Sequence, residues 1–410
     1  MMNRRDFLID AGIFAISALT AIGTHAYVAR GATDNGGDQK RLIVVFLRGA
    51  VDGLNIVVPY SETAYYQARP KIAIPQPGKV GGVLDLDNRF GLHPALAPIM
   101  PLWKQGTLAF VHAAGSPDST RSHFDAQYYM ESGTPGVRST TDGWMNRLVG
   151  ILSGHTPVQA VTVGETTPRI LSGSIPVANL ASGRNADKPL PLDRPQVAEA
   201  FDKLYSGNDG LSQTYHEGRL ARQALKGDLD AEMKMANNGA PLPYGFARDA
   251  QRLAQVMVKD SRIQLGFMDL GGWDTHVNQG GSTGQLARNL EQLGKGLASL
   301  VQGLGSVYPN TTIVVMSEFG RTVEENGNGG TDHGHGNVMW VLGGKVHGGK
   351  VYGEWPGLST NQLHEGRDLA ITTDFRDAIA TVLERHLNLD EAKLNQVFPS
   401  YTPKQKMAFI

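Results

Sequence analysis

Short, mostly apolar runs recur along the chain and divide it into segments. They cover residues 42–47, 107–112, 265–270, 312–316 and 338–342. Runs of this length with little polar alternation are typical of strands that are buried on both faces of a parallel sheet. We therefore predict that these runs form one central sheet.

The clearest amphipathic helix lies between two of these runs. Its apolar positions recur at spacings of three and four residues, and they are Leu286, Leu290, Leu293, Leu297, Leu300 and Leu304. A helix that joins two buried strands forms a βαβ unit with a parallel crossover. Residues 94–103 and 368–387 are also predicted to be helical. The pattern as a whole therefore predicts an α/β protein.

The middle of the chain, residues 156–243, does not follow this pattern. It contains short β-like pieces, then a Pro-Leu-Pro sequence at 189–191, then charged helical stretches. Residues 237–243 are rich in Asn, Gly and Pro and are typical of a linker. We interpret 156–243 as an insertion or cap within one α/β domain that spans residues 40–410.

The N-terminus has the features of an export signal. Residues 3–8 form a twin-arginine pattern, an apolar segment follows at 9–22, and small residues allow cleavage after Ala26 or Ala32. The apolar segment is short for a membrane span, which needs about 20 residues. We predict that residues 1–32 are a signal peptide read by the twin-arginine translocase. The mature protein would then be periplasmic or extracellular, without a stable membrane span; the alternative is an uncleaved anchor.

Composition narrows the chemistry that is available. The formal net charge is −1, which gives no electrostatic reason to expect nucleic acid binding. The chain has no cysteine, so it can form neither disulfides nor thiolate metal sites. Any metal would have to be held by His, Asp and Glu side chains.

Carboxylates and imidazoles follow several of the predicted strands. The candidate ligands are Asp52, Asp274, His276, Asp332, His333, His335 and His347, and Glu318 and Arg321 lie among them. In an open parallel sheet, ligands bind outside the carboxyl ends of the strands, so groups far apart in sequence can converge there. Oxygen and imidazole ligands suit one or two divalent ions, with Zn²⁺ or Mn²⁺ as the first candidates and Mg²⁺ and Ca²⁺ as further options.

Each candidate also has a purely structural interpretation. Asp52 could be a turn residue, Asp274 could cap a helix, and Glu318 with Arg321 could form an ion pair. The segment 332–335 could be a solvated loop, and His347 could be a surface residue. Two imidazoles and a carboxylate within four residues make 332–335 the most specific of these signals.

Residues 116–127, which follow the second predicted strand, contain the candidate nucleophiles. Ser122 is our candidate because it adjoins Arg121, which could bind an oxyanion, and His123, where a helix is predicted to begin. Ser116 and Ser119 are the reserves. The alternative is that Ser122 only caps this helix.

Together with the twin-arginine leader, several motifs carry a resemblance to a known family. They are residues 46–55, 121–127, 272–276, 317–322 and 332–336. They resemble an exported bacterial family known only as a domain of unknown function (DUF1501), which is in turn similar to the alkaline phosphatase and sulfatase superfamily. The resemblance implies an alkaline-phosphatase-like, doubly wound, mostly parallel sheet with helices on both faces and an inserted cap.

The resemblance also implies a division of the metal ligands. It places Asp52 with Asp332 and His333 on one ion, and Asp274 with His276 on a second that His335 or His347 completes. Two features depart from the superfamily. Asp274 and His276 are closer in sequence than in alkaline phosphatases, and residues 116–121 differ from the sulfatase signature, with no Cys to become formylglycine.

The predicted function is therefore an exported metal-dependent hydrolase of phosphate or sulfate esters, acting on a small-molecule or polymer substrate. Its catalytic residues would be Ser122, Arg121, His123, Glu318 and Arg321. The alternative is a non-catalytic exported metal-binding protein with a role in envelope or surface assembly. A periplasmic redox subunit is a weaker third option, because the chain has no dinucleotide fingerprint and no haem Cys.

Overall fold

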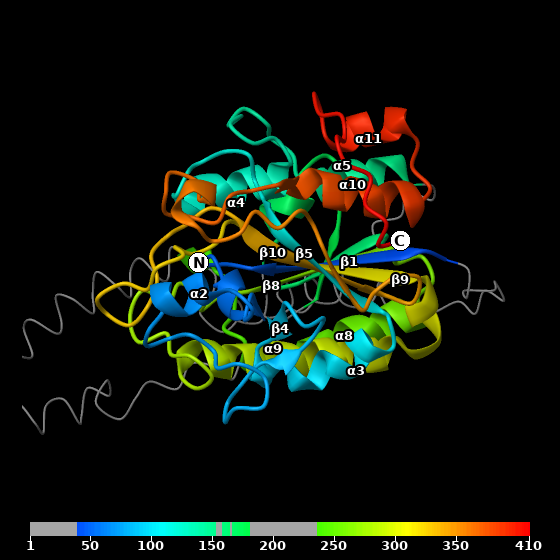
Figure 1. Ribbon diagram of the computed structural model, residues 1–410. Coiled ribbons are helices and arrows are strands. Elements are labelled where there is room, and N and C mark those ends of the chain that lie inside the picture. The colour runs from blue at the N-terminus through cyan, green and yellow to red at the C-terminus, as the bar shows by residue number, and fades with distance from the viewer. Residues whose placement is uncertain (1–38, 153–157, 165, 181–235) are drawn as a thin grey trace, which may run out of the picture.

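The computed structural model describes residues 39–152, 158–164, 166–180 and 236–410 (Figure 1). The expected signal peptide, residues 1–32, lies outside the described residues, as does most of the expected insertion at 156–243. Within the described residues, no helix combines the length and the apolar character needed to cross a membrane.

The centre of the molecule is a mixed, largely parallel β-sheet, which has nine strands in the described part of the chain. The strands are β1 (Arg41–Leu47), β5 (Leu108–Gly115), β6 (Ala160–Val163), β7 (Ala178–Leu180), β8 (Leu265–Leu270), β9 (Thr311–Ser317), β10 (Asn337–Gly343), β11 (Lys350–Tyr352) and β12 (Thr373–Asp374). Their order is β11-β5-β10-β9-β1-β8-β6-β7, and β12 pairs with β5. The five predicted strands are therefore confirmed and lie in one sheet.

One strand, β10, runs against the others. β1 pairs in parallel with β8 and β9, whereas β10 pairs antiparallel with both β9 and β5. All described strands of this sheet except β10 consequently end at the same edge, which we call the carboxyl edge. β10 begins at that edge and ends at the opposite one. This reversal decides which of the predicted site residues can meet.

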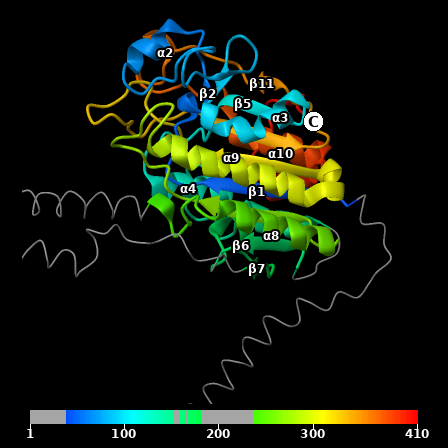
Figure 2. The same ribbon diagram turned by 90° about the horizontal axis from the view of Figure 1, so that it is seen from below.

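Helices cover both faces of the sheet. In Figure 1, α4, α5, α10 and α11 lie above the strands, and α3, α8 and α9 lie below; Figure 2 shows α8 and α9 in front of the strands from that side. The described α-helices are α2 (Thr63–Ala68), α3 (Met100–Lys104), α4 (His123–Ser132), α5 (Trp144–Ile151), α8 (Phe246–Lys259), α9 (Gln285–Leu304), α10 (Phe375–Arg385) and α11 (Glu391–Val397). The expected doubly wound arrangement is confirmed.

The apolar runs of the strands are explained by the two cores that the helices create. Successive side chains of a strand point to opposite faces, so both faces of a covered strand must be apolar. Strand β1 shows this directly. Its side chains in the core between the sheet and α9 are Ile43, Val45 and Leu47. Its side chains in the core between the sheet and α10 are Leu42, Val44 and Phe46.

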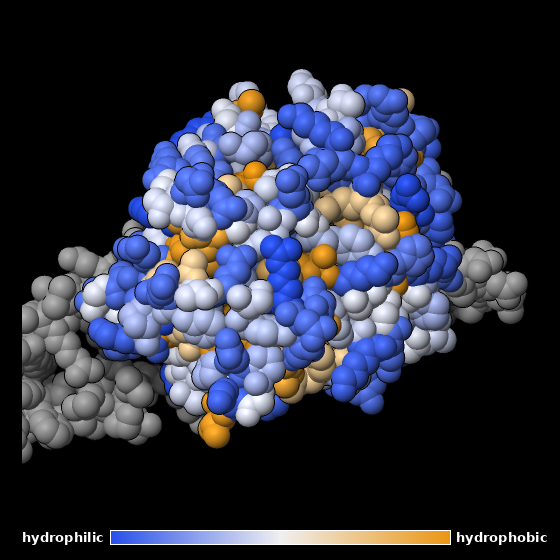
Figure 3. Space-filling model, in the orientation of Figure 1, coloured by the Kyte–Doolittle hydropathy of each residue, from blue (hydrophilic) through white to orange (hydrophobic). Residues whose placement is uncertain are grey.

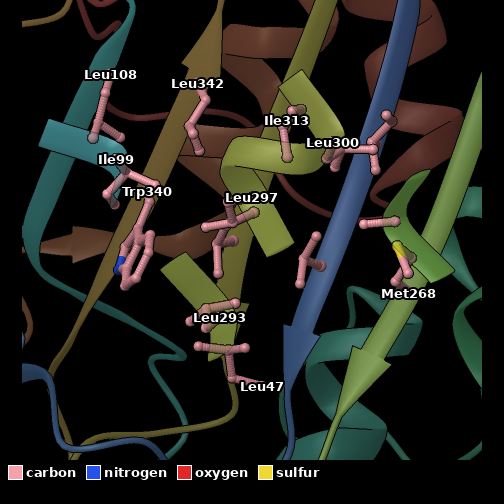
Figure 4. Packing of buried hydrophobic residues seen from close by; sticks show 14 of the residues in the cluster. Leu47, Ile99, Leu108, Met268, Leu293, Leu297, Leu300, Ile313, Trp340 and Leu342 are labelled. Atoms are coloured by element: carbon pink, nitrogen blue, oxygen red, sulfur yellow. The ribbon is translucent and has the colours of Figure 1, made fainter. Parts of the chain in front are cut away.

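The leucine stripe of α9 packs against the sheet as the periodicity predicts. Figure 4 shows Leu293, Leu297 and Leu300 directed at the strands beside Leu47 and Ile313. Each of these leucines is fully buried. Burial of such a side chain stabilises the fold by about 1.5–3 kcal/mol, so the stripe holds the βαβ unit β8–α9–β9 firmly against β1.

Two of the predicted helices differ from their expected extent. Residues 94–103 form a 3-10 helix, η2 (Pro94–Ile99), followed by the short α3, because Pro98 lies inside the segment and cannot donate to an α-helical ladder. The predicted helix 368–387 begins only at Phe375, where Asp374 caps it by accepting from the Arg376 N–H. Residues before that point include β12, which extends the sheet.

Smaller elements complete the described structure. A second sheet has the order β2-β4-β3, formed by β2 (Val57–Val58), β3 (Leu84–Asp85) and β4 (Gly91–Leu92). Short 3-10 helices lie at η1 (Gly53–Asn55), η3 (Arg169–Leu171), η5 (Gly305–Asn310) and η6 (Thr360–Gln362). The surface seen in Figure 3 is mostly hydrophilic, with hydrophobic side chains in separate small patches.

Candidate metal centre

Three histidines and one aspartate converge at the carboxyl edge of the sheet. His123 begins α4, Asp274 and His276 follow β8, and His333 lies in the loop between β9 and β10. Nε2 of His333 lies 3.0 Å from Nε2 of His123 and 2.9 Å from Nε2 of His276. Oδ1 of Asp274 lies 3.0 Å from His276, 3.5 Å from His333 and 3.6 Å from His123, measured to Nε2. One nitrogen of each ring therefore points into a common space.

The other nitrogen of each ring faces an oxygen acceptor outside this space. Nδ1 of His123 lies 2.8 Å from Glu318 Oε1, and Nδ1 of His276 lies 3.2 Å from Asp332 Oδ1. Nδ1 of His333 lies 2.9 Å from the backbone oxygen of Arg121. An acceptor at Nδ1 requires the N–H there, so each neutral ring presents the Nε2 lone pair inward. Histidines that ligate metals use this arrangement, with the outer N–H bound to a carboxylate or carbonyl.

Asp274 is the second indication that a cation belongs in this space. Its side chain is fully buried, and Oδ1 accepts a hydrogen bond of 2.6 Å from Nη2 of Arg321. Oδ2 is buried and has no hydrogen-bond partner among the described residues. A buried acceptor without a partner costs about 1–3 kcal/mol, and a cation would offset that cost if the carboxylate used Oδ2 as well as Oδ1 to bind it.

The spacing of these atoms fits a single ion. Ligands about 2.0–2.1 Å from one tetrahedral Zn²⁺ lie about 3.3 Å from each other. His123 Nε2, His333 Nε2 and Asp274 Oδ1 are separated by 3.0, 3.5 and 3.6 Å. These three residues form a group whose ligand atoms all lie within 4.8 Å of one another, and His276 contacts two of its members. The donor set therefore fits a divalent cation.

The charges around the centre favour a positive occupant. Burial of Asp274 acts to raise its pKa, but hydrogen bonds with the three imidazoles and the charge of Arg321 hold that pKa well below its usual range. Burial of His123 acts to lower its pKa, yet hydrogen bonds with Asp274 and Glu318 raise it to about 9. A hydrogen bond with Asp274 likewise raises the pKa of His276. Protons and a metal ion therefore compete for the same nitrogens.

Glu318 holds His123 in place from outside. It is fully buried, and Oε1 also accepts from the Gly49 N–H at 2.8 Å and from Gln127 Nε2 at 2.9 Å. Burial would raise the pKa of Glu318, but the hydrogen bond and charge of His123 and the hydrogen bond from Gln127 lower it to about 2. A carboxylate with these three donors fixes both the position and the tautomer of the ring.

Backbone contacts at Gly49 bring β1 close to the centre. Gly49 has φ of 111°, and a Cβ there would lie 2.7 Å from the backbone nitrogen of Asp274. Only glycine accommodates both the dihedral angle and this approach. Arg321 reinforces the same junction, because Nη2 donates to the Gly49 oxygen at 2.6 Å and Nε donates to the Ala50 oxygen at 2.6 Å. Arg321, expected to be catalytic, is thus a buried residue that positions Asp274.

The structure does not bring Asp52 into this group, which corrects the pairing expected with Asp332 and His333. Both oxygens of Asp52 are bound by Arg69, at 2.6 Å from Nη1 and 3.0 Å from Nη2. Gln279 Nε2 adds a third bond of 2.7 Å to Oδ2. The guanidinium supplies the positive charge that an ion was expected to supply, so Asp52 belongs to a fully buried ion pair.

His335 and His347 also lie outside the group of ligands. His335 stacks on His364, with ring centroids 4.2 Å apart, and burial followed by the charge of His364 lowers its pKa to about 4. His347 follows β10 and therefore lies at the opposite edge of the sheet, where its backbone N–H donates to the Phe409 backbone oxygen at 2.8 Å. The expectation that His347 completes a second ion is wrong, because the reversed direction of β10 carries it to the opposite edge of the sheet. A role for His335 in a second ion stays a prediction.

The remaining predicted residues take other positions. Asp332 is mostly exposed and accepts from Asn326 as well as contacting His276, so it is an outer partner of His276. Arg121 is paired with Glu365 and Asp368. Ser122 is the N-cap residue of α4, but its hydroxyl makes no capping hydrogen bond. His123, expected to be catalytic, supplies one of the inward nitrogens.

Sequence reasoning missed Gln127 and Arg69. Gln127 lies four residues after His123 and thus on the same face of α4, a spacing that could have suggested a shared partner. Its Oε1 accepts from Arg48 at 2.9 Å while its Nε2 donates to Glu318. Arg69 comes just after α2, and no local pattern links it to Asp52.

Comparison with known proteins identifies the family. The model of the family described as "Protein of unknown function (DUF1501)" matches residues 39–398, so the chain belongs to that family. No curated protein matches the chain.

Solved structures that resemble the chain do so distantly. The crystal structure of Ps i-CgsB in complex with k-i-k-neocarrahexaose shares 12% identity over 87% of this chain and 74% of that one, with a TM-score of 0.39. The zinc complex of the C-terminal periplasmic domain of EcEptC from Escherichia coli shares 11% identity over 92% of this chain and 94% of that one, with a TM-score of 0.39. The lipoteichoic acid synthase LtaP from Listeria monocytogenes shares 9% identity over 85% of this chain and 80% of that one, with a TM-score of 0.36. Functional inference for this chain therefore rests on the geometry of its own site.

Proposed function

We propose that this member of a family without a stated activity is a metal-dependent hydrolase of phosphate or sulfate esters that acts outside the cytoplasm. In this proposal, His123, Asp274 and His333 hold one divalent cation, and His276 either completes its coordination or lies beside it. Imidazole nitrogens in the donor set favour Zn²⁺ or Mn²⁺ over Mg²⁺ and Ca²⁺, which prefer oxygen ligands.

The observation that carries the proposal is the direction of the ring nitrogens. His123, His276 and His333 each bind an oxygen acceptor with Nδ1 and turn Nε2 toward the same buried carboxylate. In a neutral polar cluster donors would face acceptors, whereas here the Nε2 lone pairs of the neutral rings face the Asp274 carboxylate, which has one donor from Arg321. A cation is the partner that satisfies such a set.

The position of the centre supports hydrolysis. It lies at the carboxyl edge of the sheet, where open α/β sheets bind ligands, and His276 and His333 keep 20% and 17% of their side-chain surface exposed. A divalent cation supplies Lewis acidity toward ester oxygens and lowers the pKa of a bound water. Glu318 and Arg321 hold the ligands in place, and Ser122 at the start of α4 is the candidate nucleophile. The ester class itself comes from the resemblance of the motifs.

Metal analysis combined with a panel of aryl phosphate and sulfate esters tests this function. Protein purified without chelator should carry a divalent metal and cleave at least one ester. The variant His333→Ala should lose both, and the matched control His347→Ala, at the opposite edge of the sheet, should keep both. A wild-type protein that binds no divalent metal would overturn the proposal.

One feature favours the non-catalytic alternative. If His276 joins the other three residues, the ion has four protein ligands, and closed sets of four are typical of structural zinc sites, whereas catalytic sites keep an open position. Substitution with Co²⁺ separates the two cases. Inorganic phosphate should change the visible spectrum of the Co²⁺ protein if a position is open; an unchanged spectrum together with bound metal and no turnover would support a role in envelope or surface assembly.

Export through the twin-arginine translocase is the part of the proposal that concerns location. It rests on Arg4 and Arg5 within the leader sequence. Replacing both with Lys should retain the precursor in the cytoplasm, because the transport receptor reads this pair. Normal export of that double variant would contradict the proposal without affecting the metal centre.

A further inference from the structure

The guanidinium of Arg121 lies between two carboxylates beside the metal centre. Nη2 of Arg121 is 2.7 Å from Asp368 Oδ2 and 2.7 Å from Glu365 Oε2. The two carboxylates differ in their surroundings, because Asp368 is fully buried whereas the Glu365 side chain is 58% exposed. One partner of Arg121 is therefore fixed in the protein interior, and the other reaches in from the surface.

Asp368 holds a second guanidinium as well. Arg367 Nε donates to Asp368 Oδ1 at 2.9 Å, and Arg367 Nη2 donates to Oδ2 at 3.3 Å. Two arginines on one buried carboxylate leave one positive charge to be balanced. Glu365 supplies that balance here, and a bound anion could supply it equally well.

Both arginines are tied directly to the proposed ligand His333. The backbone oxygen of Arg121 faces His333 Nδ1 at 2.9 Å, and Arg367 Nη2 donates to the backbone oxygen of His333. Arg121 also directly precedes Ser122 and His123 in the chain. An anion on these guanidiniums would therefore be next to the loops that form the metal centre.

The present partners do not satisfy the donors of this cluster. Nε of Arg121 is buried and has no hydrogen-bond partner among the described residues, since both carboxylates accept from Nη2. Nε2 of His364, which lies 3.9 Å from Glu365 Oε1, is also buried without a hydrogen-bond partner in the described part of the chain. The Nε–Nη2 side of a guanidinium is one of the forks that bind two oxygens of a phosphate or carboxylate at once. A tetrahedral oxyanion has the oxygens to use both nitrogens of this fork.

Glu365 is suited to leave Arg121. It lies in a tight turn with φ of 54°, and among the described residues its carboxylate pairs with Arg121 and His364. Exposed ion pairs of this kind contribute little to stability. Movement of this side chain into solvent would consequently be cheap, whereas Asp368 would stay in place.

We propose that Arg121 and Arg367, held by Asp368, form the subsite for the phosphate or sulfate group of the substrate, and that the Glu365 carboxylate occupies this subsite until the anion displaces it. This inference rests on the proposed function for the identity of the anion. It adds a competing side chain that lowers the affinity of the resting protein for anions and thereby selects substrates with a strongly charged group.

Calorimetric titration with inorganic phosphate tests this inference on the full-length mature protein, both with its metal and after chelation. Glu365→Gln should bind phosphate about twofold to fivefold more tightly than wild type, since the exposed pair that it removes is weak. Glu384→Gln, which removes a comparable surface carboxylate paired with Lys406, should bind phosphate as wild type does. Arg121→Gln should weaken phosphate binding about tenfold or more, both with the metal and after chelation.

The outcomes separate this inference from the proposed function. Equal phosphate affinity of wild type and Glu365→Gln, unchanged affinity in Arg121→Gln, or no phosphate binding by any variant would each overturn the subsite. Tighter binding by Glu365→Gln in chelated protein would support the subsite even if no ester were hydrolysed. Loss of metal binding would remove the hydrolase proposal while leaving that result intact.

Discussion

Nε2 of His123 and Nε2 of His333 lie 3.0 Å apart, although each ring already binds an acceptor through Nδ1. Two neutral rings in these tautomers would turn lone pairs toward each other. The contact is favourable only with a positive charge between or beside the nitrogens, either a proton or a metal ion. The same fold that positions Glu318 and the Arg121 carbonyl therefore makes this pair a site for a cation.

A single ion per chain is expected, because Arg69 neutralises the carboxylate that a second ion would need. Asp274→Asn should lose the bound metal, whereas Asp52→Asn should retain it. Asp52→Asn should instead lower the free energy of unfolding by about 3–5 kcal/mol, since it leaves the buried Arg69 without its charge partner. Metal content per chain and urea unfolding of both variants check this expectation. Two ions per chain, or loss of metal in Asp52→Asn, would contradict it.

Much of the fold could be predicted from the pattern of apolar residues alone. Strand β1 reads as a continuous apolar run because Leu42 and Ile43 face different cores, and both cores are covered by helices. The leucine stripe of α9 could be read for the same reason. Such patterns report burial, and burial fixes where the elements are.

The direction of a strand is not encoded in its own pattern. A run such as β10 is apolar whether it lies parallel or antiparallel to its neighbours, so the sequence could not show that His347 would end at the wrong edge. Partners that are distant in sequence are equally hidden. Nothing near Asp52 indicates that Arg69 would occupy its oxygens, whereas His276 and His333 were predictable because each lies in a loop that follows a predicted strand.

Gln127 is expected to support metal binding without touching the metal. Its amide donates to Glu318, which in turn fixes His123, so Gln127→Leu should loosen the ring and weaken metal affinity about tenfold to a hundredfold. The control is Tyr128→Phe, because the Tyr128 hydroxyl binds the Arg138 and Thr140 carbonyls instead. Competition with a chromophoric chelator measures both affinities. Equal values for Gln127→Leu and wild type would show that Glu318 holds His123 unaided.

The free energy of unfolding should fall as the solution is made acidic, partly because of His112. Burial lowers the pKa of His112 to about 4. Nδ1 accepts from the Ala113 N–H while Nε2 faces the Val57 oxygen, which leaves no place for a second proton. The unfolded state therefore binds more protons below pH of about 6.5, its ordinary pKa. The contribution is fully present above that pH and is lost as the pH falls toward about 4.

Comparison of wild type with His112→Gln isolates this effect. Between pH of about 7.5 and about 5, wild type should lose about 2 kcal/mol more of its free energy of unfolding than the variant, because the glutamine at position 112 does not titrate. Urea unfolding at both values measures the difference. Identical losses in the two proteins would mean that His112 is not held neutral.

Ser122 is the hydroxyl whose removal should stop turnover if the mechanism is covalent. It is the N-cap residue of α4, yet its hydroxyl makes no capping bond, so the oxygen is not committed to the helix. It lies between Arg121 and His123, at a helix start whose amides favour negative charge. Ser122→Ala should abolish ester hydrolysis while metal content and thermal unfolding stay as in wild type.

Ser116→Ala is the matched control for this variant, because the Ser116 hydroxyl already accepts from the Asp118 N–H at 3.3 Å. It should retain most of the activity. If Ser122→Ala hydrolyses esters at the wild-type rate, the nucleophile is not this hydroxyl, and either a reserve hydroxyl, Ser119 or Ser116, or water attacks the ester instead. Rapid-quench detection of a phosphorylated or sulfated protein distinguishes the two routes, since only attack by a side chain leaves the group on the chain.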